Sequence, residues 1–316
     1  ESARCVLRDP TIDYAVFETA RGGMVRAGLG YDLSNVGVIT NVASDHLGLH
    51  GIQTMEQMTR LKSIVAENIY EDGYAILNAD DDNVYSMMKN ITCQPALFSM
   101  VATNPRVTEH CSKGGVAAVY EDGSIVLRKG DWSIPVEKVI NIPLTHSGKA
   151  VFQIQNVLAA CLAAFVQEVK VEEIRNSLQT FVPSPAQLPG RMNVFTFERY
   201  KIIIDYAHNP AGMEAMGKFV VSLGSDHSIA IIAGTGDRRD EDLKDYSRVA
   251  GEYFDELIIW EDQDSARGRD SREVMDLIVE GAKFKPGNIF QIILDEDEAV
   301  DHALKNAPDN SIICIF

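Results

Sequence analysis

The chain has 316 residues, of which 46% are hydrophobic, and its formal net charge at pH 7 is −17. This size and apolar content suffice for a large core, most simply divided between two domains. So acidic a chain disfavours general binding to nucleic acid, whose phosphates are neutralised by Lys and Arg. No run of about 18 apolar residues predicts a helix that crosses a membrane.

The cysteines indicate a reducing compartment. They lie at Cys5, Cys93, Cys111, Cys161 and Cys314. Their odd number and scattered positions, without C-x-x-C spacing, predict free thiols. No signal peptide is visible, so we expect a cytoplasmic protein. Because the first residue is Glu rather than Met, position 1 is not taken as a biological start.

The first 90 residues are expected to alternate between strands and helices. Apolar runs predict strands at Ile12–Phe17, Val36–Asn41 and Tyr74–Leu77. Apolar residues at helical spacing predict a helix over Thr54–Asn68, with Thr54 as its N-cap. A further helix is expected after Asp80–Asp82 and through Met88.

Residues 91–145 change in character. Short strand-like pieces, Ala117–Tyr120 and Ser124–Arg128, flank a turn at Glu121-Asp122-Gly123. We interpret this stretch as a β-rich insertion or subdomain. The Ala-rich segment Val151–Val166 predicts a buried helix.

The stretch "VPSPAQLPG" at 182–190 has three prolines and is the best domain boundary in the chain. We therefore expect one domain over 1–182, a linker over 183–190 and a second domain over 191–316. The strands expected in the second domain are Lys201–Asp205, Ile229–Ala233, Glu256–Trp260, Ile289–Leu294 and Ser311–Phe316. The helices expected between them are Ala211–Leu223, Asp240–Phe254, Arg272–Ala282 and Glu296–Lys305. This alternation predicts an α/β fold with a parallel sheet.

Two segments of the first half carry candidate chemistry. "ETARGGMVRAGLG" (18–30) follows an expected strand and could be a phosphate-binding loop, a metal site or a flexible turn. "TNVASDHLGLHG" (40–51) places Asp45 and His46 after another expected strand, where open parallel sheets bind ligands. His46 and Glu18 are suitable metal ligands. Alternatively, Asp45 caps the next turn and His46 is an ordinary loop residue.

Lys62 lies on the apolar-striped helix, 16 residues after His46. A lysine there is usually a surface residue whose stem lies along apolar neighbours. A half-buried lysine can instead lose its proton and react with CO₂ to form a carbamate that binds metal.

Two segments of the second half also carry candidate ligand-binding residues. In "IDYAHNPAG" (204–212), Asp205 is suited to bond a ribose hydroxyl, whereas Asn209 also suits the N-cap of the following helix. "AGTGDRRDED" (233–242) combines glycines and arginines near a helix start, which favours an anion. Asp240 is equally suited to be a plain helix N-cap.

Together these segments resemble the Mur ligase family of ATP-dependent amide-forming ligases. The resemblance rests on three features in this order: "TNVASDHLGLHG", Lys62 placed 16 residues after His46, and "DYAHNP" after Gly190–Met192. It covers nearly the whole chain. It implies a Mur ligase-like central domain, truncated at its N-terminus, and a Rossmann-like C-terminal domain, with ATP and Mg²⁺ as cofactors.

The resemblance implies a catalytic metal centre in the first domain. Glu18 and His46 match the positions that hold Mg²⁺. Lys62 matches the lysine that is carbamylated in many members and steadies a second Mg²⁺. Asn156, in "NVLAA", matches the asparagine that faces the adenine.

The second domain is implied to close on ATP and to meet the acceptor. Arg191 and Asp205 match residues at the phosphates and ribose, and His208 and Asn209 belong to the same motif. A further set is expected to bind substrate: Arg238 and Asp240, which match a segment near the acceptor amino acid, and Arg21, which we suggest for the acidic substrate.

"ETARGGMVRAGLGYD", "DGYAILNADDD", "GDRRDEDL" and the segment Glu261–Arg269 favour one branch of the family. Members of that branch join arginine to the β-carboxyl of aspartate in a polyaspartate backbone. The expected substrates are thus arginine and an acidic polymer or peptide, with no nucleic acid and no membrane. In this reading Glu18 to Gly30 is a metal-and-substrate turn, bent at Gly22 and Gly23.

The phosphate loop of the family, G-T-N-G-K-T-T, does not occur in these residues. We therefore expect the carboxy-terminal part of a longer enzyme, inactive alone, with a missing N-terminal half or a homo-oligomer as partner. Another Mur-type ligase, for a cell-wall precursor or polyglutamate, is one alternative. A non-catalytic binding or scaffold subunit is the other.

Overall fold

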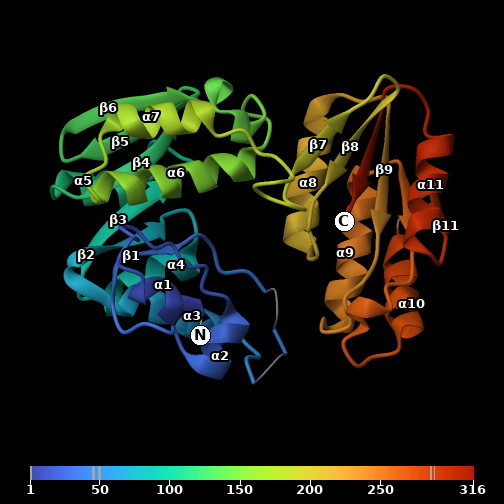
Figure 1. Ribbon diagram of the computed structural model, residues 1–316, viewed down its shortest axis with the longest axis horizontal. Coiled ribbons are helices and arrows are strands. Elements are labelled where there is room, and N and C mark those ends of the chain that lie inside the picture. Colours follow the sequence, from blue (N-terminus) through green and yellow to red (C-terminus); the bar gives the residue numbers. More distant parts are fainter. Residues whose placement is uncertain (1, 45–46, 49–50, 285–286, 288) are drawn as a thin grey trace. The chain divides into compact units, whose positions relative to one another are not determined.

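The computed structural model describes residues 2–44, 47–48, 51–284, 287 and 289–316. They form two compact units, one of residues 2–44 and 51–181 and one of residues 47–48 and 182–316. Each unit has its own six-stranded sheet with helices packed on it (Figure 1). Among the described residues no helix is long and apolar enough to cross a bilayer.

The sheet of the first unit runs in chain order, β1 to β6. Its strands are β1 (Ser34–Ile39), β2 (Ile69–Asn78), β3 (Gln94–Ser99), β4 (Val116–Glu121), β5 (Ser124–Lys129) and β6 (Trp132–Lys138). The first four are parallel, and β5 and β6 are added as antiparallel hairpins. The carboxyl ends of β1, β2 and β3 therefore meet at one edge of the sheet.

The helices of the first unit are α1 (Ser2–Arg8), α2 (Arg21–Ala27), α3 (Met55–Glu67), α4 (Asp82–Tyr85), α5 (Pro105–Ser112), α6 (Val151–Val166) and α7 (Val171–Thr180). Short 3₁₀ turns cover Ser86–Asn90, Val139–Asn141 and Pro143–Thr145. Helix α6 packs on β2, β3 and β4, and its Ile154, Leu158 and Leu162 are buried in the main core cluster. Burying side chains of this size stabilises the fold by about 1.5–3 kcal/mol each.

The capping chemistry expected for α3 is present. The Thr54 hydroxyl accepts the Gln57 N–H, and the Gln57 side chain accepts the Thr54 N–H in return. This capping box satisfies two backbone donors that the first turn leaves open. The expected helix at Val151–Val166 is confirmed with the same bounds.

The strand expected at Ile12–Phe17 is wrong. Residues 12–20 have no strand or helix, and Tyr14 and Val16 are 74% and 97% exposed. An apolar run becomes a strand only when its backbone groups find a neighbouring ladder, and none of the described strands pairs with this one.

The interpretation of 91–145 as an insertion or subdomain is also wrong. Strand β3 pairs with β2 and β4, so the segment continues the sheet of the first unit. The expected turn is present, with Asp122 and Gly123 both at positive φ, 47° and 77°. Two adjacent residues of this kind are typical of the tight turn of a two-residue hairpin.

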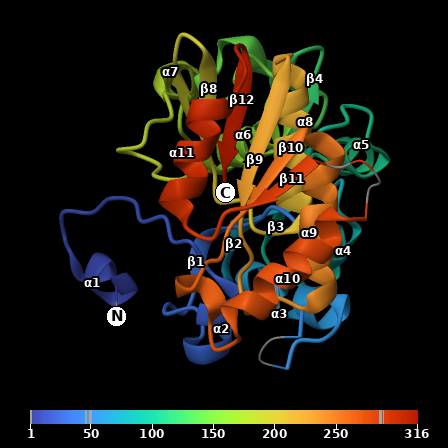
Figure 2. The same ribbon diagram turned by 90° about the vertical axis from the view of Figure 1, so that its right-hand side faces the viewer.

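The second unit has the strands β7 (Asn193–Thr196), β8 (Tyr200–Ile204), β9 (His227–Ile232), β10 (Glu256–Ile259), β11 (Ile289–Ile292) and β12 (Ser311–Ile315). Their order is β11-β10-β9-β12-β8-β7, and Figure 2 shows β12 between β8 and β9. All neighbours are parallel except β7 and β8. The expected parallel α/β arrangement is confirmed.

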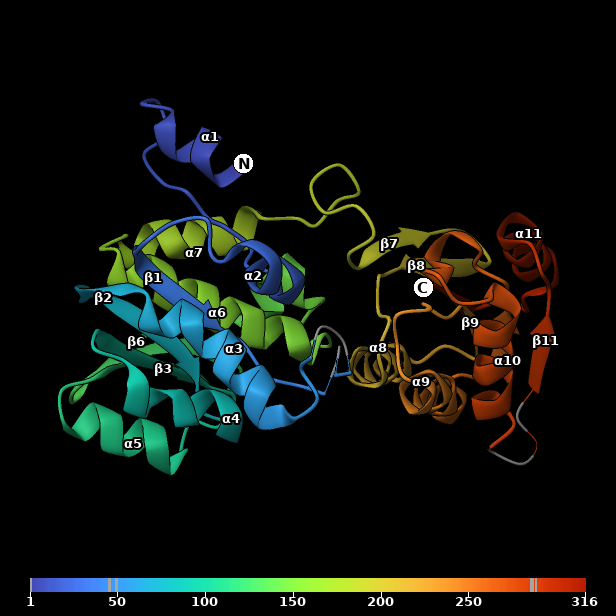
Figure 3. The same ribbon diagram turned by 90° about the horizontal axis from the view of Figure 1, so that it is seen from below.

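The helices of this unit are α8 (Pro210–Leu223), α9 (Asp240–Tyr253), α10 (Ser271–Ala282) and α11 (Glu296–Asn306), with a 3₁₀ turn at Asp264–Ala266. Helices α8, α9 and α10 pack in succession, whereas α11 packs on β9, β10 and β12 (Figure 3). Right-handed crossovers produce this division, because the chain moves outward from β8 to β11 and then returns to β12.

Candidate active site

The loop after β1 is fixed by side chains from the neighbouring strand end. Asn78, 4% exposed, donates its side-chain amide to the Thr40 carbonyl at 2.8 Å. The Asp81 carboxylate accepts the Val42 N–H at 2.8 Å and also caps α4 through the Val84 N–H at 3.0 Å. These bonds determine the path of the chain as it leaves the sheet toward residues 43 and 44.

Lys62 reaches the same loop from α3. Its ammonium donates to the Asn41 carbonyl at 3.0 Å, and the side chain is half-buried. The Lys62 ammonium is therefore held at the carboxyl edge of the sheet. This position is compatible with the metal-side role that the family resemblance implies.

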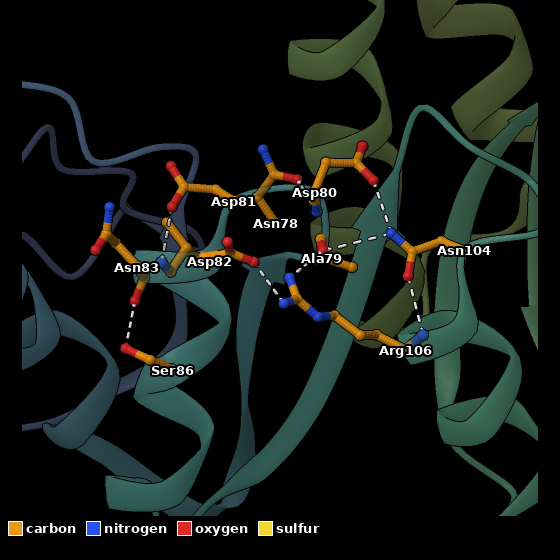
Figure 4. A network of polar contacts seen from close by, with 10 residues as sticks. Asn78, Ala79, Asp80, Asp81, Asp82, Asn83, Ser86, Asn104 and Arg106 are labelled. Atoms are coloured by element: carbon orange, nitrogen blue, oxygen red, sulfur yellow. Dashed lines mark hydrogen bonds and ion pairs between the residues drawn. The ribbon is translucent and has the colours of Figure 1, made fainter.

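A carboxylate cluster organises the next strand ends (Figure 4). Asp80 accepts the Ser99 hydroxyl at 2.6 Å, the Met100 N–H at 2.6 Å and the Asn104 amide at 2.8 Å. Arg106 completes the network by donating to the Ala79 carbonyl at 2.9 Å. These bonds join the loops after β2 and β3, so the role of Asp80 here is structural.

Glu18 and Arg21 lie just before and at the start of α2. Glu18 is exposed, and Arg21 is half-buried. The turn predicted at Gly22 and Gly23 is wrong, because both glycines lie inside the helix Arg21–Ala27. The chain bends later, at Gly28, whose φ is 71° and whose N–H closes the helix on the Met24 carbonyl at 3.0 Å.

The metal ligands predicted from the sequence stay predictions. His46 lies outside the described residues, and so does Asp45. Within the described residues, no group of three or more His, Cys, Asp or Glu side chains is arranged to hold a metal. Glu18 offers a hard oxygen and Lys62 a nitrogen, so each is chemically suited to its implied role.

Asn156 is exposed on α6, and its amide donates to the Gln153 side chain at 3.0 Å. A side chain on an exposed helix face keeps hydrogen-bonding capacity for a ligand. Its predicted contact with adenine stays a prediction.

In the second unit, the loop after β8 surrounds a half-buried carboxylate. Asp205 accepts the Met192 N–H at 2.9 Å, which joins this loop to the segment before β7. Burial raises the pKa of Asp205, while the Met192 N–H and the Arg191 charge oppose that shift. The carboxylate is thus a desolvated acceptor of the kind suited to a sugar hydroxyl.

Two side chains lie close to the ring of Tyr206 beside this carboxylate. The Arg191 guanidinium lies 5.4 Å from the ring centre of Tyr206, and the His208 ring lies 5.2 Å from it. His208 is also within 2.9 Å of the Tyr206 carbonyl through Nδ1. The sequence analysis did not single out Tyr206, which is 51% exposed.

Asn209 acts as a helix cap, the structural alternative raised above. Its side chain accepts the Gly212 N–H at 2.8 Å, with Pro210 at the first helical position. The loop is supported from below by Tyr246, whose buried hydroxyl donates to the Ala207 carbonyl at 3.0 Å. From the sequence pattern alone, Tyr246 could be predicted only as an ordinary core residue of α9.

Arginines and carboxylates converge after β9 and β10. Arg238 is buried and pairs with Asp237 at 2.8 Å. Asp240 pairs at 3.0 Å with Arg269, which follows the next strand. The N-cap of α9 is Arg239 rather than Asp240, and Asp240 is the first helical residue.

Two family models match the chain in succession. The Mur ligase middle domain matches residues 5–164, and the Mur ligase glutamate ligase domain matches residues 190–316. The chain belongs to the Mur ligase family. Of the described residues that the family resemblance selected, Asp205, His208 and Asn209 follow β8 at the carboxyl edge of the second sheet, and Arg238 follows β9 at the same edge.

Three related proteins show which kinds of enzyme the chain is similar to. The chain is 48% identical over 317 residues to a cyanophycin synthetase of Nostoc sp., and 46% identical to one of Synechocystis sp.. Both matches cover all of this chain, which spans about a third of the length of these relatives (35% and 36%). A diaminopimelate-adding ligase of Bacillus cereus is 28% identical over 91% of this chain and 55% of that protein.

Solved structures share the fold. MurF from Acinetobacter baumannii matches with a TM-score of 0.62 and 18% identity, over 89% of this chain and 56% of the other. E. coli FolC in complex with ADP matches with a TM-score of 0.64 and 16% identity, over 90% of this chain and 59% of the other. The expected Mur ligase-like architecture is confirmed.

Proposed function

We propose that the chain is part of an ATP-dependent ligase of the cyanophycin synthetase type. In this proposal it joins arginine to the β-carboxyl of aspartate in a polyaspartate backbone. The observation that supports it most is the 48% identity to a cyanophycin synthetase across the whole chain. Residues 1–182 serve as the ATP-binding domain, 183–190 as a linker and 191–316 as the closing domain.

The first domain supplies the metal-side residues. Glu18 and His46 would hold Mg²⁺, and Lys62, whose ammonium donates to the Asn41 carbonyl at the carboxyl edge of the sheet, would steady a second ion once carbamylated. Asn156 contacts the adenine. Mg²⁺ supplies the charge that offsets the negative charge of the transferring phosphoryl group.

The second domain supplies the nucleotide clamp and the acceptor site. Asp205 accepts a ribose hydroxyl, Arg191 adds positive charge toward the phosphates, and His208 belongs to the same nucleotide-binding loop. Asn209 acts through α8, which it caps. Arg238 and Asp240 face the acceptor amino acid, and Arg21 contacts the acidic substrate.

The reaction proceeds through an acyl phosphate. The β-carboxylate of aspartate attacks the γ-phosphorus of ATP and releases ADP. The acceptor amine then attacks the acyl carbon, and phosphate leaves as the amide forms. Arginines that neutralise charge on the phosphoryl group and on the tetrahedral intermediate lower both barriers.

These 316 residues contain no phosphate loop. Such a loop contributes backbone N–H groups and a Lys that hold the β- and γ-phosphates. We therefore expect little or no turnover from these residues alone.

The test is a chimera in which these residues replace the matching third of the Nostoc relative. We expect phosphate release that requires ATP, Mg²⁺, an aspartate primer and arginine. The matched control is Asp245→Asn, which breaks an exposed ion pair with Arg248 on α9 and should leave turnover unchanged. A preference for another amino acid would instead support a cell-wall or polyglutamate ligase.

Calorimetry with ATP and Mg²⁺, on the isolated chain and on the chimera, distinguishes the ligase from the remaining alternative, a non-catalytic scaffold subunit. Nucleotide binding supports the ligase. A chimera that folds but binds no nucleotide would favour a non-catalytic scaffold subunit.

A further inference from the structure

The loops after β9 and β10 are in direct backbone contact. The Gly236 N–H donates to the Ser265 carbonyl at 2.8 Å. A Cβ atom on Gly236 would lie 1.8 Å from the Ala266 carbonyl oxygen, so no other residue fits there. The two loops therefore form one rigid platform at the carboxyl edge of the second sheet.

Asp237 lies between two arginines on this platform. One carboxylate oxygen accepts Arg238 at 2.8 Å, and the other accepts Arg267 from the loop after β10. The side chains of Arg238, Asp237 and Arg267 are 4%, 21% and 44% exposed. A single half-buried carboxylate thus sets the direction of one buried and one accessible guanidinium.

The backbone at Arg267 also depends on its surroundings. Arg267 is left-handed, with φ 48° and ψ 40°, and Gly268 follows at φ 92°. A side-chain-bearing residue adopts this region when neighbouring contacts hold it there. The ion pair to Asp237 is such a contact.

A second connection holds the loops together without Asp237. Arg269 donates to the Asp240 carboxylate at 3.0 Å and to the Arg238 carbonyl at 3.3 Å. Loss of the Asp237 charge should therefore release the accessible Arg267 guanidinium and change the orientation of the buried Arg238 guanidinium, while the platform stays assembled.

We propose that Asp237 is a positioning residue for the acceptor amino acid. Its carboxylate fixes Arg238 and Arg267 so that both present their charge to the acceptor in one arrangement. This inference rests on the proposed function, in which Arg238 faces the acceptor. Charge-assisted bonds to both oxygens provide the orientation, and a neutral amide, with a single acceptor oxygen, cannot reproduce it.

Asp237→Asn in the chimera tests the proposal by kinetics. We expect the KM for arginine to rise about tenfold or more, with kcat and the KM for ATP within about twofold of the parent. Asp237→Glu, which keeps the charge, should recover part of the affinity. An unchanged KM for arginine in Asp237→Asn would overturn the proposal.

Side-chain NMR of the isolated chain provides a readout that needs no turnover. Restricted rotation of the Arg267 guanidinium group is expected in the parent chain and should be lost in Asp237→Asn. Asp245→Asn is the control, because it removes one contact of Arg248, which keeps its ion pair with Glu252, and should leave Arg267 restricted. A freely rotating Arg267 group in the parent would contradict the proposal.

The two readouts separate this inference from the proposed function. If the parent chimera does not use arginine while Asp237→Asn frees the Arg267 guanidinium group, the proposed substrate is wrong and the positioning role of Asp237 stands. If arginine is used and its KM does not change, the positioning role is wrong and the proposed function stands.

Discussion

The two sheets hold their carboxyl-edge loops in different ways. In the first unit, Asn78, Asp80 and Asp81 bond mainly to backbone groups and short neutral side chains. In the second unit, Asp237 and Asp240 pair with arginines of another loop. The first arrangement fixes the path of the backbone, whereas the second fixes the direction of charged side chains.

The largest effect is expected where the loops of the second unit touch. Gly236→Ala should destabilise that unit by about 3 kcal/mol or more, because its Cβ would overlap the Ala266 carbonyl and force the loops apart. Denaturant unfolding, followed by a probe in each unit, measures the loss. Gly23→Ala is the control, since its Cβ meets nothing within 4 Å and α2 should gain about 0.5–1 kcal/mol. Equal losses from both would contradict the close contact.

In the first unit, Asp81→Ala should cost about 2 kcal/mol. The substitution removes a helix N-cap, worth about 1 kcal/mol, and the bond to the Val42 N–H, worth about as much. Urea unfolding measures the free energy, and the exchange rate of the Val42 amide hydrogen should rise. A change below about 0.5 kcal/mol would show that the loop after β1 is held by other contacts.

A smaller, pH-dependent effect is expected at Asp205. Burial raises the pKa of this carboxyl above its ordinary value of 3.8. A raised pKa stabilises the fold below the unfolded value, and that stabilisation is lost as the pH rises through the folded value. Asp205→Asn should therefore raise the Tm of the second unit more at pH 7 than at pH 3.5. A pH-independent difference would contradict this.

The opposite pH dependence of stability is expected in the first unit. Burial lowers the pKa of His110, and its ring fills the space beside Gly115. A lowered pKa means stability that is complete above the unfolded value of 6.5 and is lost as the pH falls through the folded value. His110→Gln should reduce this acid sensitivity. Melting curves between pH 7.5 and 5 test it, and an unchanged pH profile would exclude His110 as the cause.

Much of the second unit could be predicted because each element carries its own signal. Its strands are short apolar runs, and Asn209-Pro210 marks the start of α8. The segment Ile12–Phe17 is also a short apolar run, but the strand predicted there is absent. Strand formation requires a neighbouring strand to pair with, and the local sequence does not specify that neighbour. The turn predicted at Gly22 and Gly23 was also wrong, because both glycines lie inside a helix that the surrounding residues favour.

The family could be predicted by motif, but the contacts among the candidate site residues could not. Asp237 and Arg267 are 30 residues apart, and only the parallel order of β9 and β10 brings their loops together. Tyr206 and Tyr246 also gain their roles from neighbours on other elements. Spacing along the chain contains no information about such contacts.

The central claim is that these residues form part of a ligase that adds arginine to aspartate. The most direct measurement is mass spectrometry of the product that the chimera makes from a polyaspartate primer, ATP and arginine. The account predicts arginine attached through amide bonds to aspartate β-carboxyls, formed with one phosphate released per bond. A different amino acid in the product, or attachment through the α-carboxyl alone, would contradict it.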